Sequence, residues 1–77
     1  MSAALVEYLA RQLVDDPDAV RVQEAERDGA LVLELHVAEA DVGKVIGRGG
    51  RIARALRTVV RAAAARGNRR VLLEIVG

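Results

Sequence analysis

Three glycines within four residues, in the segment Gly47-Arg48-Gly49-Gly50, constrain the fold of this chain more than any other feature. Glycine is costly inside a helix because it loses the most backbone freedom on folding, and it favours left-handed turns. Apolar side chains recur at helical spacing on both sides of the glycines, over about residues 39–46 and 51–66. The sequence therefore predicts two helices joined by a tight glycine turn.

The first part of the chain predicts a helix followed by a β-hairpin. Helical spacing of leucines predicts a helix over residues 3–14. Strands are expected over residues 20–27 and 30–37, joined by Asp28-Gly29. That dipeptide favours a two-residue hairpin turn because both positions tolerate positive φ.

A strand predicted over residues 71–76 completes the order α-β-β-α-α-β. Alternating apolar residues indicate that the sheet buries one face, and three helices can supply the apolar layer against it. With 77 residues, we expect a single α+β domain over residues 1–77, a three-stranded sheet covered by three helices. The apolar face of the helix over 51–66 is expected to consist of Ile52, Leu56, Val59, Val60 and Ala63. The opposite face is expected to consist of Arg54, Arg57 and Arg61.

Composition excludes several classes of protein. The chain has no cysteine, and it has only one serine, one threonine, one tyrosine and one histidine, so neither disulfides nor an enzyme is expected. His36 has no second ligand at metal-binding spacing, and no metal, cofactor or small-molecule substrate is expected. No apolar run approaches the roughly 20 residues of a membrane span. Charged Glu7 and Arg11 argue against a signal peptide, so a cytoplasmic location is the expectation.

The formal net charge of +1 conceals a strong division along the chain. Residues 1–41 carry ten acidic and three basic side chains, whereas residues 42–77 carry nine basic and one acidic side chain. A neutral chain with one basic part is a candidate for binding a polyanion on that part. The pattern also fits attraction between two parts of a fold, so charge alone leaves both interpretations open.

Three kinds of phosphate-binding loop compete for the glycine segment. A P-loop fails, because position 38 is not glycine and Val45 follows Lys44 where serine or threonine is required. A dinucleotide fingerprint fails, because its third glycine would fall at Ile52 and a helix precedes the loop. A Gly-x-x-Gly loop between two helices, preceded by Val-Ile, fits in residues and in context, as in KH domains that bind single-stranded RNA.

The chain resembles the small bacterial single-KH RNA-binding proteins of the KhpA type, which have the type II KH order. The resemblance runs over essentially the whole chain, through segments 5–9, 13–18, 43–48, 50–53, 57–60, 62–65 and 71–75. It implies a cytoplasmic RNA-binding homodimer that pairs with a larger KH-containing protein of the Jag or EloR type. It also implies a role as a post-transcriptional regulator or RNA chaperone, linked in some bacteria to cell shape. Gly49 departs from the family, which usually has a polar side chain there, so ordering the loop costs more entropy.

The physical reading and the resemblance together define the expected RNA site. The glycines leave room for a sugar-phosphate backbone, basic side chains hold phosphates, and Val45, Ile46 and Ile52 form the floor of an apolar groove. The expected RNA-binding residues are Lys44, Val45, Ile46, Gly47, Arg48, Gly49, Gly50, Arg51, Ile52 and Arg54. The wall opposite the floor is either the hairpin or the last strand.

A different function remains open beside RNA binding. The chain is alternatively a protein-interaction or dimerisation module with weak RNA binding. The alanine run 62–65 lacks bulk and would allow close helix packing in a dimer interface. Arg66, Arg69 and Arg70 precede the last strand and are candidates for a second phosphate contact, or they are simply solvated.

Overall fold

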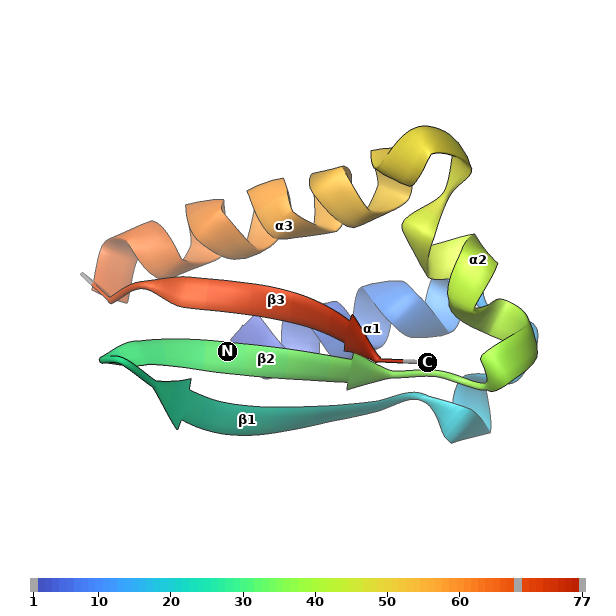
Figure 1. Ribbon diagram of the computed structural model, residues 1–77, viewed down its shortest axis with the longest axis horizontal. Coiled ribbons are helices and arrows are strands. Elements are labelled where there is room, and N and C mark those ends of the chain that lie inside the picture. Colours follow the sequence, from blue (N-terminus) through green and yellow to red (C-terminus); the bar gives the residue numbers. More distant parts are fainter. Residues whose placement is uncertain (1, 68, 77) are drawn as a thin grey trace.

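The computed structural model describes residues 2–67 and 69–76, and its elements follow the predicted order (Figure 1). The helices are α1 (Ser2–Leu13), α2 (Val42–Ile46) and α3 (Arg51–Ala64). The strands are β1 (Arg21–Arg27), β2 (Ala30–His36) and β3 (Val71–Val76). Short 3-10 turns lie at Pro17–Ala19, Glu39–Asp41, Arg48–Gly50 and Ala65–Gly67. The α+β class and the order α-β-β-α-α-β are confirmed, with element ends shifted by a few residues.

The three strands form one mixed sheet in the order β1-β2-β3. Strand β1 pairs antiparallel with β2 through the predicted turn, where Asp28 has φ +51° and Gly29 has φ +80°. Strand β2 pairs in parallel with β3, with Leu33 opposite Leu73. A parallel pair needs a long crossover, and the chain between β2 and β3 supplies it with α2, the glycine turn and α3.

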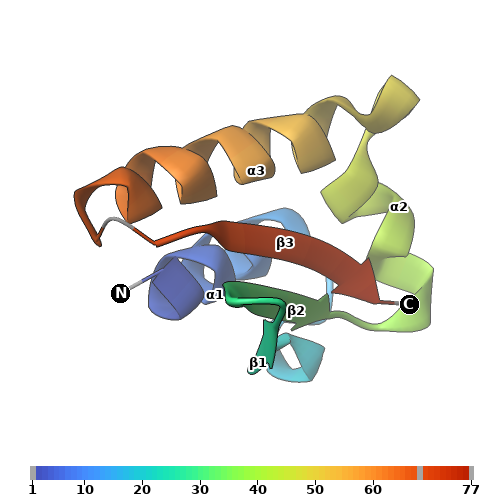
Figure 2. The same cartoon turned by 60° about the vertical axis from the view of Figure 1, so that its left-hand side comes forward.

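The core lies between the sheet and the helices. Figures 1 and 2 show α1 behind the sheet and α3 running alongside β3. Burying a side chain such as Leu33 fully contributes about 1.5–3 kcal/mol, and several elements supply such side chains. The buried core cluster consists of Val6, Ala10, Val20, Leu33, Leu35, Val45, Leu56, Val60, Val71 and Leu73.

The predicted apolar face of α3 requires a correction. Ala53, Leu56 and Val60 are buried, whereas Val59 is 38% exposed and Ala63 is also exposed. The buried stripe is thus rotated around the helix toward the arginines, because α3 packs against β3 as well as against α1. This rotation leaves part of the apolar surface of α3 facing solvent and brings arginines next to the sheet edge.

The other face of the sheet carries an ion cluster across all three strands. Arg27 of β1 forms a two-pronged ion pair with Glu74 of β3, with N···O distances of 3.1 and 3.2 Å. It also lies 3.6 Å from Glu34 of β2. The hydrogen bond from Arg27 lowers the pKa of Glu74 below its ordinary value. Val32, on the same face of β2, is fully buried although no helix within the described residues covers this side.

Candidate nucleic-acid interface

The predicted glycine turn is present between α2 and α3. The N–H of Gly47 donates to the carbonyl of Gly43 over 2.9 Å and ends α2. The N–H of Gly50 then donates to the carbonyl of Gly47 over 3.1 Å, which closes the turn. Gly47, Gly49 and Gly50 have φ values of +76°, +64° and +78°, a region that favours glycine.

The glycines of the turn have different structural roles. A Cβ built on Gly47 would lie 2.7 Å from Cγ1 of Ile52 and 3.0 Å from its backbone nitrogen, so glycine is required there for packing. A Cβ on Gly49 or Gly50 would meet nothing within 4 Å. Open space for an approaching backbone therefore lies at the second and third glycines, whereas the first one serves the fold.

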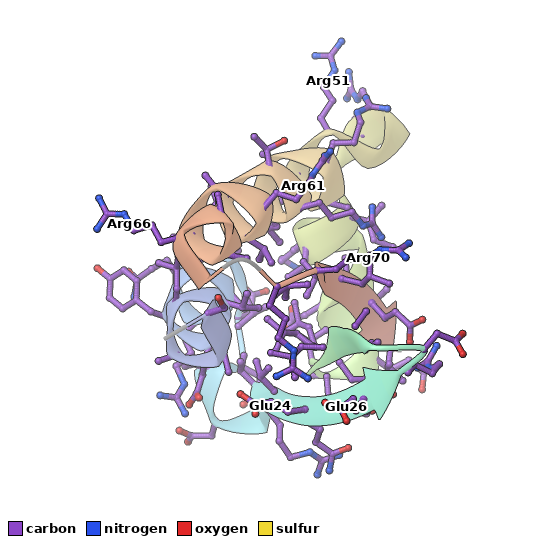
Figure 3. The ribbon with its side chains drawn as sticks, turned by 90° about the vertical axis from the view of Figure 1, so that its left-hand side faces the viewer. Glu24, Glu26, Arg51, Arg61, Arg66 and Arg70 are labelled. Carbon is purple, nitrogen blue, oxygen red and sulfur yellow. The ribbon has the colours of Figure 1, made fainter. Side chains whose placement is uncertain are left out.

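The turn presents the start of α3 together with two arginines. Gly50 precedes the helix and offers no side chain to cap it, while the N–H of Arg51 already donates to the carbonyl of Arg48. The following N–H groups of the first turn have no partner within the helix and carry the positive end of its dipole. Arg48 and Arg51 are exposed, and Figure 3 shows Arg51 projecting outward at this end of the helix.

A groove of about 220 Å³ lies between α3 and the edge of β3. This α3–β3 groove is lined by Arg57, Val60, Arg61, Val71, Leu72 and Leu73. The Nε of Arg57 donates to the carbonyl of Leu73 over 3.3 Å, so its side chain reaches across the groove to the strand. Arg61 follows one helical turn later and lies on the side of α3 away from α1, like Arg70 (Figure 3).

The structure does not bring the three predicted floor residues onto one exposed surface. Val45 has no exposed surface and belongs to the core, which corrects its predicted place on an open floor. Ile52 is partly buried against the core, and Ile46 is 37% exposed. None of the three lines the α3–β3 groove, whose walls are α3 and β3.

Lys44 is held by acidic residues on the side of α2. Its Nζ lies 3.3 Å from Asp15 and 3.4 Å from Asp41, and these carboxylates raise the pKa of Lys44 above its ordinary 10.5. The Oδ2 of Asp41 accepts the backbone N–H of Asp16 over 3.1 Å. This cluster ties α2 to the segment that follows α1, so Lys44 has a structural partner before any ligand arrives.

Asp41 keeps its charge although it is only 2% exposed. Burial by itself would raise the pKa of this carboxyl. Hydrogen bonds from the N–H groups of Asp16 and Asp15, and then from Lys44, outweigh burial and lower the pKa of Asp41 below its ordinary 3.8.

All six residues that line the α3–β3 groove were absent from the predicted site: Arg57, Val60, Arg61, Val71, Leu72 and Leu73. Of the arginine face of α3, the sequence prediction placed only Arg54 in the RNA site. Arg57 and Arg61 are four residues apart and share a helix face, which was the available signal. Arg54 is exposed and does not line the groove.

Arginines of α3 and acidic side chains of β1 lie on different sides of the molecule. Figure 3 shows Arg51, Arg61 and Arg70 on the side of α3, whereas Glu24 and Glu26 lie on β1 at the other side. Arg69 forms an ion pair with Glu26, and Arg66 lies toward α1. A polyanion would therefore meet the least repulsion along α3.

The described part of the chain lacks a membrane-spanning helix and a cluster of metal-ligating side chains. Within residues 2–67 and 69–76, no helix is both long and apolar enough to cross a membrane. The same residues contain no group of three or more His, Cys, Asp or Glu side chains placed to share a metal ion.

Comparisons with known proteins agree with this geometry. The RNA-binding protein KhpA of Clostridium acetobutylicum is 53% identical over 72 residues, which is 94% of this chain and 96% of that protein. Its counterpart from Halalkalibacterium halodurans is 54% identical over 72 residues, 94% of this chain and 95% of that protein. Among solved structures, Aquifex aeolicus Era bound to GDP and AlF4− shares the fold, with a TM-score of 0.66 at 24% identity. That likeness covers 96% of this chain and 29% of the Era chain.

The family profile described as "KhpA/KhpB, KH domain" matches residues 3–75. The match includes α1, the hairpin, the glycine turn, α3 and nearly all of β3. The order α-β-β-α-α-β, with the glycine turn between two helices, is the type II KH order that the resemblance implied. The chain is therefore a member of the KhpA/KhpB family of KH domains.

Proposed function

We propose that this chain binds single-stranded RNA, without catalysing a reaction on it, through the glycine turn and the α3–β3 groove. One observation carries the proposal: an uncapped helix start, open space at Gly49 and Gly50, and the exposed side chains of Arg48 and Arg51 occur at one turn. The name "RNA-binding protein" of relatives about half identical to this chain supports the same function.

The RNA backbone crosses the turn at Gly49 and Gly50 in this proposal. Phosphate oxygens accept hydrogen bonds from the first N–H groups of α3 and from the forked guanidinium groups of Arg48 and Arg51. The bases then turn into the α3–β3 groove and pack against aliphatic side chains. Aromatic stacking is not available, because the one aromatic residue, Tyr8, lies on α1. Binding is accordingly weak and dependent on salt.

The remaining predicted residues support the turn in this proposal. Val45 anchors α2 in the core, and Gly47 allows Ile52 to close against the turn. Lys44 adds positive potential while its ion pairs hold α2 in place. Arg54 and Ile46 are exposed beside the turn and extend the contact surface.

Fluorescence anisotropy with a randomised single-stranded RNA pool, measured at two salt concentrations, tests this function. For wild type, the logarithm of the binding constant should fall with the logarithm of salt, with a slope of about −0.7 for each phosphate contact. The double variant Arg48→Asp, Gly49→Asp should lose most of the affinity. Aspartate tolerates the left-handed backbone of Gly49 better than most residues, so the fold should survive.

The matched control is the double variant Arg21→Asp, Gly29→Asp. It makes the same change of charge and also replaces a glycine with positive φ and open Cβ space, but in the hairpin. Figure 1 shows the hairpin turn and the glycine turn at opposite ends of the molecule. Equal binding by wild type and the Arg48, Gly49 variant, or equal losses in both double variants, would contradict the proposed site.

A second candidate function is self-association, favoured by apolar surface on the far side of α3. A cavity of about 820 Å³ opens between the N-terminal part of α1, the C-terminal part of α3 and the hairpin. It is lined by Ser2, Leu5, Glu24, Leu31, Ala62, Ala63, Ala64, Arg66, Gly67, Arg69 and Val71. Tyr8 of α1 is 62% exposed, and Val59 of α3 is also exposed. We propose that a second copy, or a larger KH-containing protein of the Jag or EloR type, covers this surface.

Light scattering during size-exclusion chromatography tests the second function. Ala63→Glu places a charge on the exposed alanine surface and should shift the mass from dimer toward monomer. Ala40→Glu, in an exposed 3-10 turn away from the cavity, is the control and should leave the mass unchanged. A wild-type protein that is monomeric at every concentration would rule out self-association.

In the wider role that we propose, the protein is a cytoplasmic post-transcriptional regulator or RNA chaperone.

A further inference from the structure

The edge of β3 presents backbone hydrogen-bonding groups to the α3–β3 groove. The N–H of Leu31 donates to the carbonyl of Arg70 over 2.9 Å, so that carbonyl faces β2. Successive residues of a strand point their backbone groups to opposite sides, and the carbonyl of Leu73 therefore faces away from β2. Its hydrogen bond from Arg57 shows that it faces α3.

Arg57 places hydrogen-bond donors at the centre of the groove. Its Nε donates to the carbonyl of Leu73, which leaves that carbonyl with only one free lone pair to accept a hydrogen bond from a ligand. Among the described residues, no hydrogen bond or ion pair engages its two Nη groups. The N–H of Leu73 points to the same side as its carbonyl. A ligand in the groove therefore meets N–H groups from the helix and from the strand.

Nucleobases differ in the edges that can face such a surface. Guanine presents the adjacent acceptors O6 and N7, and an arginine can bind both at once. Cytosine presents the adjacent acceptors O2 and N3. On each hydrogen-bonding edge of adenine, the ring acceptor lies beside the N6 amino group, which is a donor. That amino group would face the guanidinium without a partner. A donor surface should therefore discriminate against adenine.

We propose that Arg57 determines the base preference of this domain, by favouring guanine or cytosine over adenine in the α3–β3 groove. The proposal rests on the proposed function, in which bases enter this groove. Tethering by Leu73 limits the guanidinium of Arg57 to few orientations, so its fork is already arranged for a planar ligand. Arg54 lies on the same helix but does not line the groove, so it supplies charge without this arrangement.

The experiment compares short single-stranded RNAs that differ only in a central block of adenine, cytosine, guanine or uracil. Wild type should bind the guanine or the cytosine RNA about 5- to 10-fold more tightly than the adenine RNA, the lower part of the range for a bidentate contact. Arg57→Lys keeps the charge but loses the fork, so this ratio should fall to about one. Circular dichroism verifies that each variant is folded.

Arg21→Lys is the matched control, because it makes the same substitution at an exposed arginine of β1 outside the groove. It should keep the wild-type ratio. The inference is overturned if wild type binds the four RNAs equally, or if Arg57→Lys keeps the preference. Failure of wild type to bind any of the RNAs would instead overturn the proposed function itself, and the inference with it.

Discussion

At the scale of single residues, Gly43, Gly47 and Gly49 differ in backbone conformation or in what an added methyl group would meet. Gly47→Ala combines a left-handed φ with a 2.7 Å approach to Ile52, so it should cost more than the roughly 1–2 kcal/mol of the backbone conformation alone. Gly49→Ala should lose only the stability that the left-handed backbone conformation costs. Gly43→Ala, in α2 with ordinary φ and open space, should stabilise the fold by about 0.5–1 kcal/mol.

Urea unfolding of the three variants checks this order. The midpoint should be highest for Gly43→Ala and lowest for Gly47→Ala, with similar slopes for all of them. A Gly47→Ala variant as stable as Gly49→Ala would mean that Ile52 moves aside easily, and the packing role assigned to Gly47 would be wrong.

The Asp41 carboxyl and the Lys44 ammonium should make stability depend on pH at both extremes. The pKa of Asp41 is lowered on folding, so its contribution is present above pH 3.8 and is lost as the pH falls through the folded value. The pKa of Lys44 is raised, so its contribution is present below pH 10.5 and is lost as the pH rises through the folded value.

Thermal unfolding across pH tests this linkage with Asp41→Asn. The amide keeps an oxygen to accept the Asp16 N–H but removes the charge beside Lys44. Its melting temperature should be lower than that of wild type near neutral pH, and the gap should close in acid. A constant gap at every pH would show that the loss does not come from the carboxylate charge.

At the scale of elements, two neighbouring residues of β3 have different main roles, one in stability and one in ligand binding. Leu73 is buried in the core, so Leu73→Ala should cost about 2–5 kcal/mol. Leu72 is 41% exposed and lines the groove, so Leu72→Ala should cost much less and should mainly weaken RNA binding. Denaturant unfolding and anisotropy on both variants check this. A Leu72→Ala variant that is as unstable as Leu73→Ala would show that β3 depends on both of its faces.

Elements specified by local patterns were predictable from the sequence. The hairpin followed from Asp28-Gly29, and the break between α2 and α3 from the glycine segment, because turn chemistry acts over a few residues. Docking between distant elements was not predictable in the same way. The spacing of apolar residues within α3 places Val59 on its buried face. The rotation of α3 about its axis is set by packing against β3, and this rotation leaves Val59 exposed. The tether from Arg57 likewise depends on a strand that lies after the helix.

For the same reason, the sequence predicted the surroundings of some candidate site residues but not of others. Arg48 and Arg51 belong to the glycine turn itself, and the structure places both of them there, exposed. One acidic partner of Lys44, Asp41, lies three residues earlier, a spacing that the sequence shows. The other partner, Asp15, follows another helix, and only the tertiary fold brings it to Lys44. No spacing rule within α2 would have revealed that contact.

At the scale of the whole molecule, the separation of charges should act on the rate of RNA binding. Arginines along α3 attract a polyanion from a distance, whereas the acids of β1 face elsewhere (Figure 3). Long-range attraction is screened by salt and accelerates encounter more than it slows release. Stopped-flow measurements at two salt concentrations should therefore place most of the salt dependence in the association rate. A salt effect confined to the dissociation rate would instead indicate that only close contacts matter.

The parallel pairing of β2 with β3 also bears on the synthesis of the protein. The hairpin joins neighbouring segments, but β2 must wait for a strand that lies beyond α3, with Leu31 opposite Val71. Contacts between such distant segments form late, because a long loop must close first. A nascent chain that has released only the segment up to α3 lacks one wall of the α3–β3 groove. Such an unfinished chain cannot present that groove to any RNA, its own messenger included.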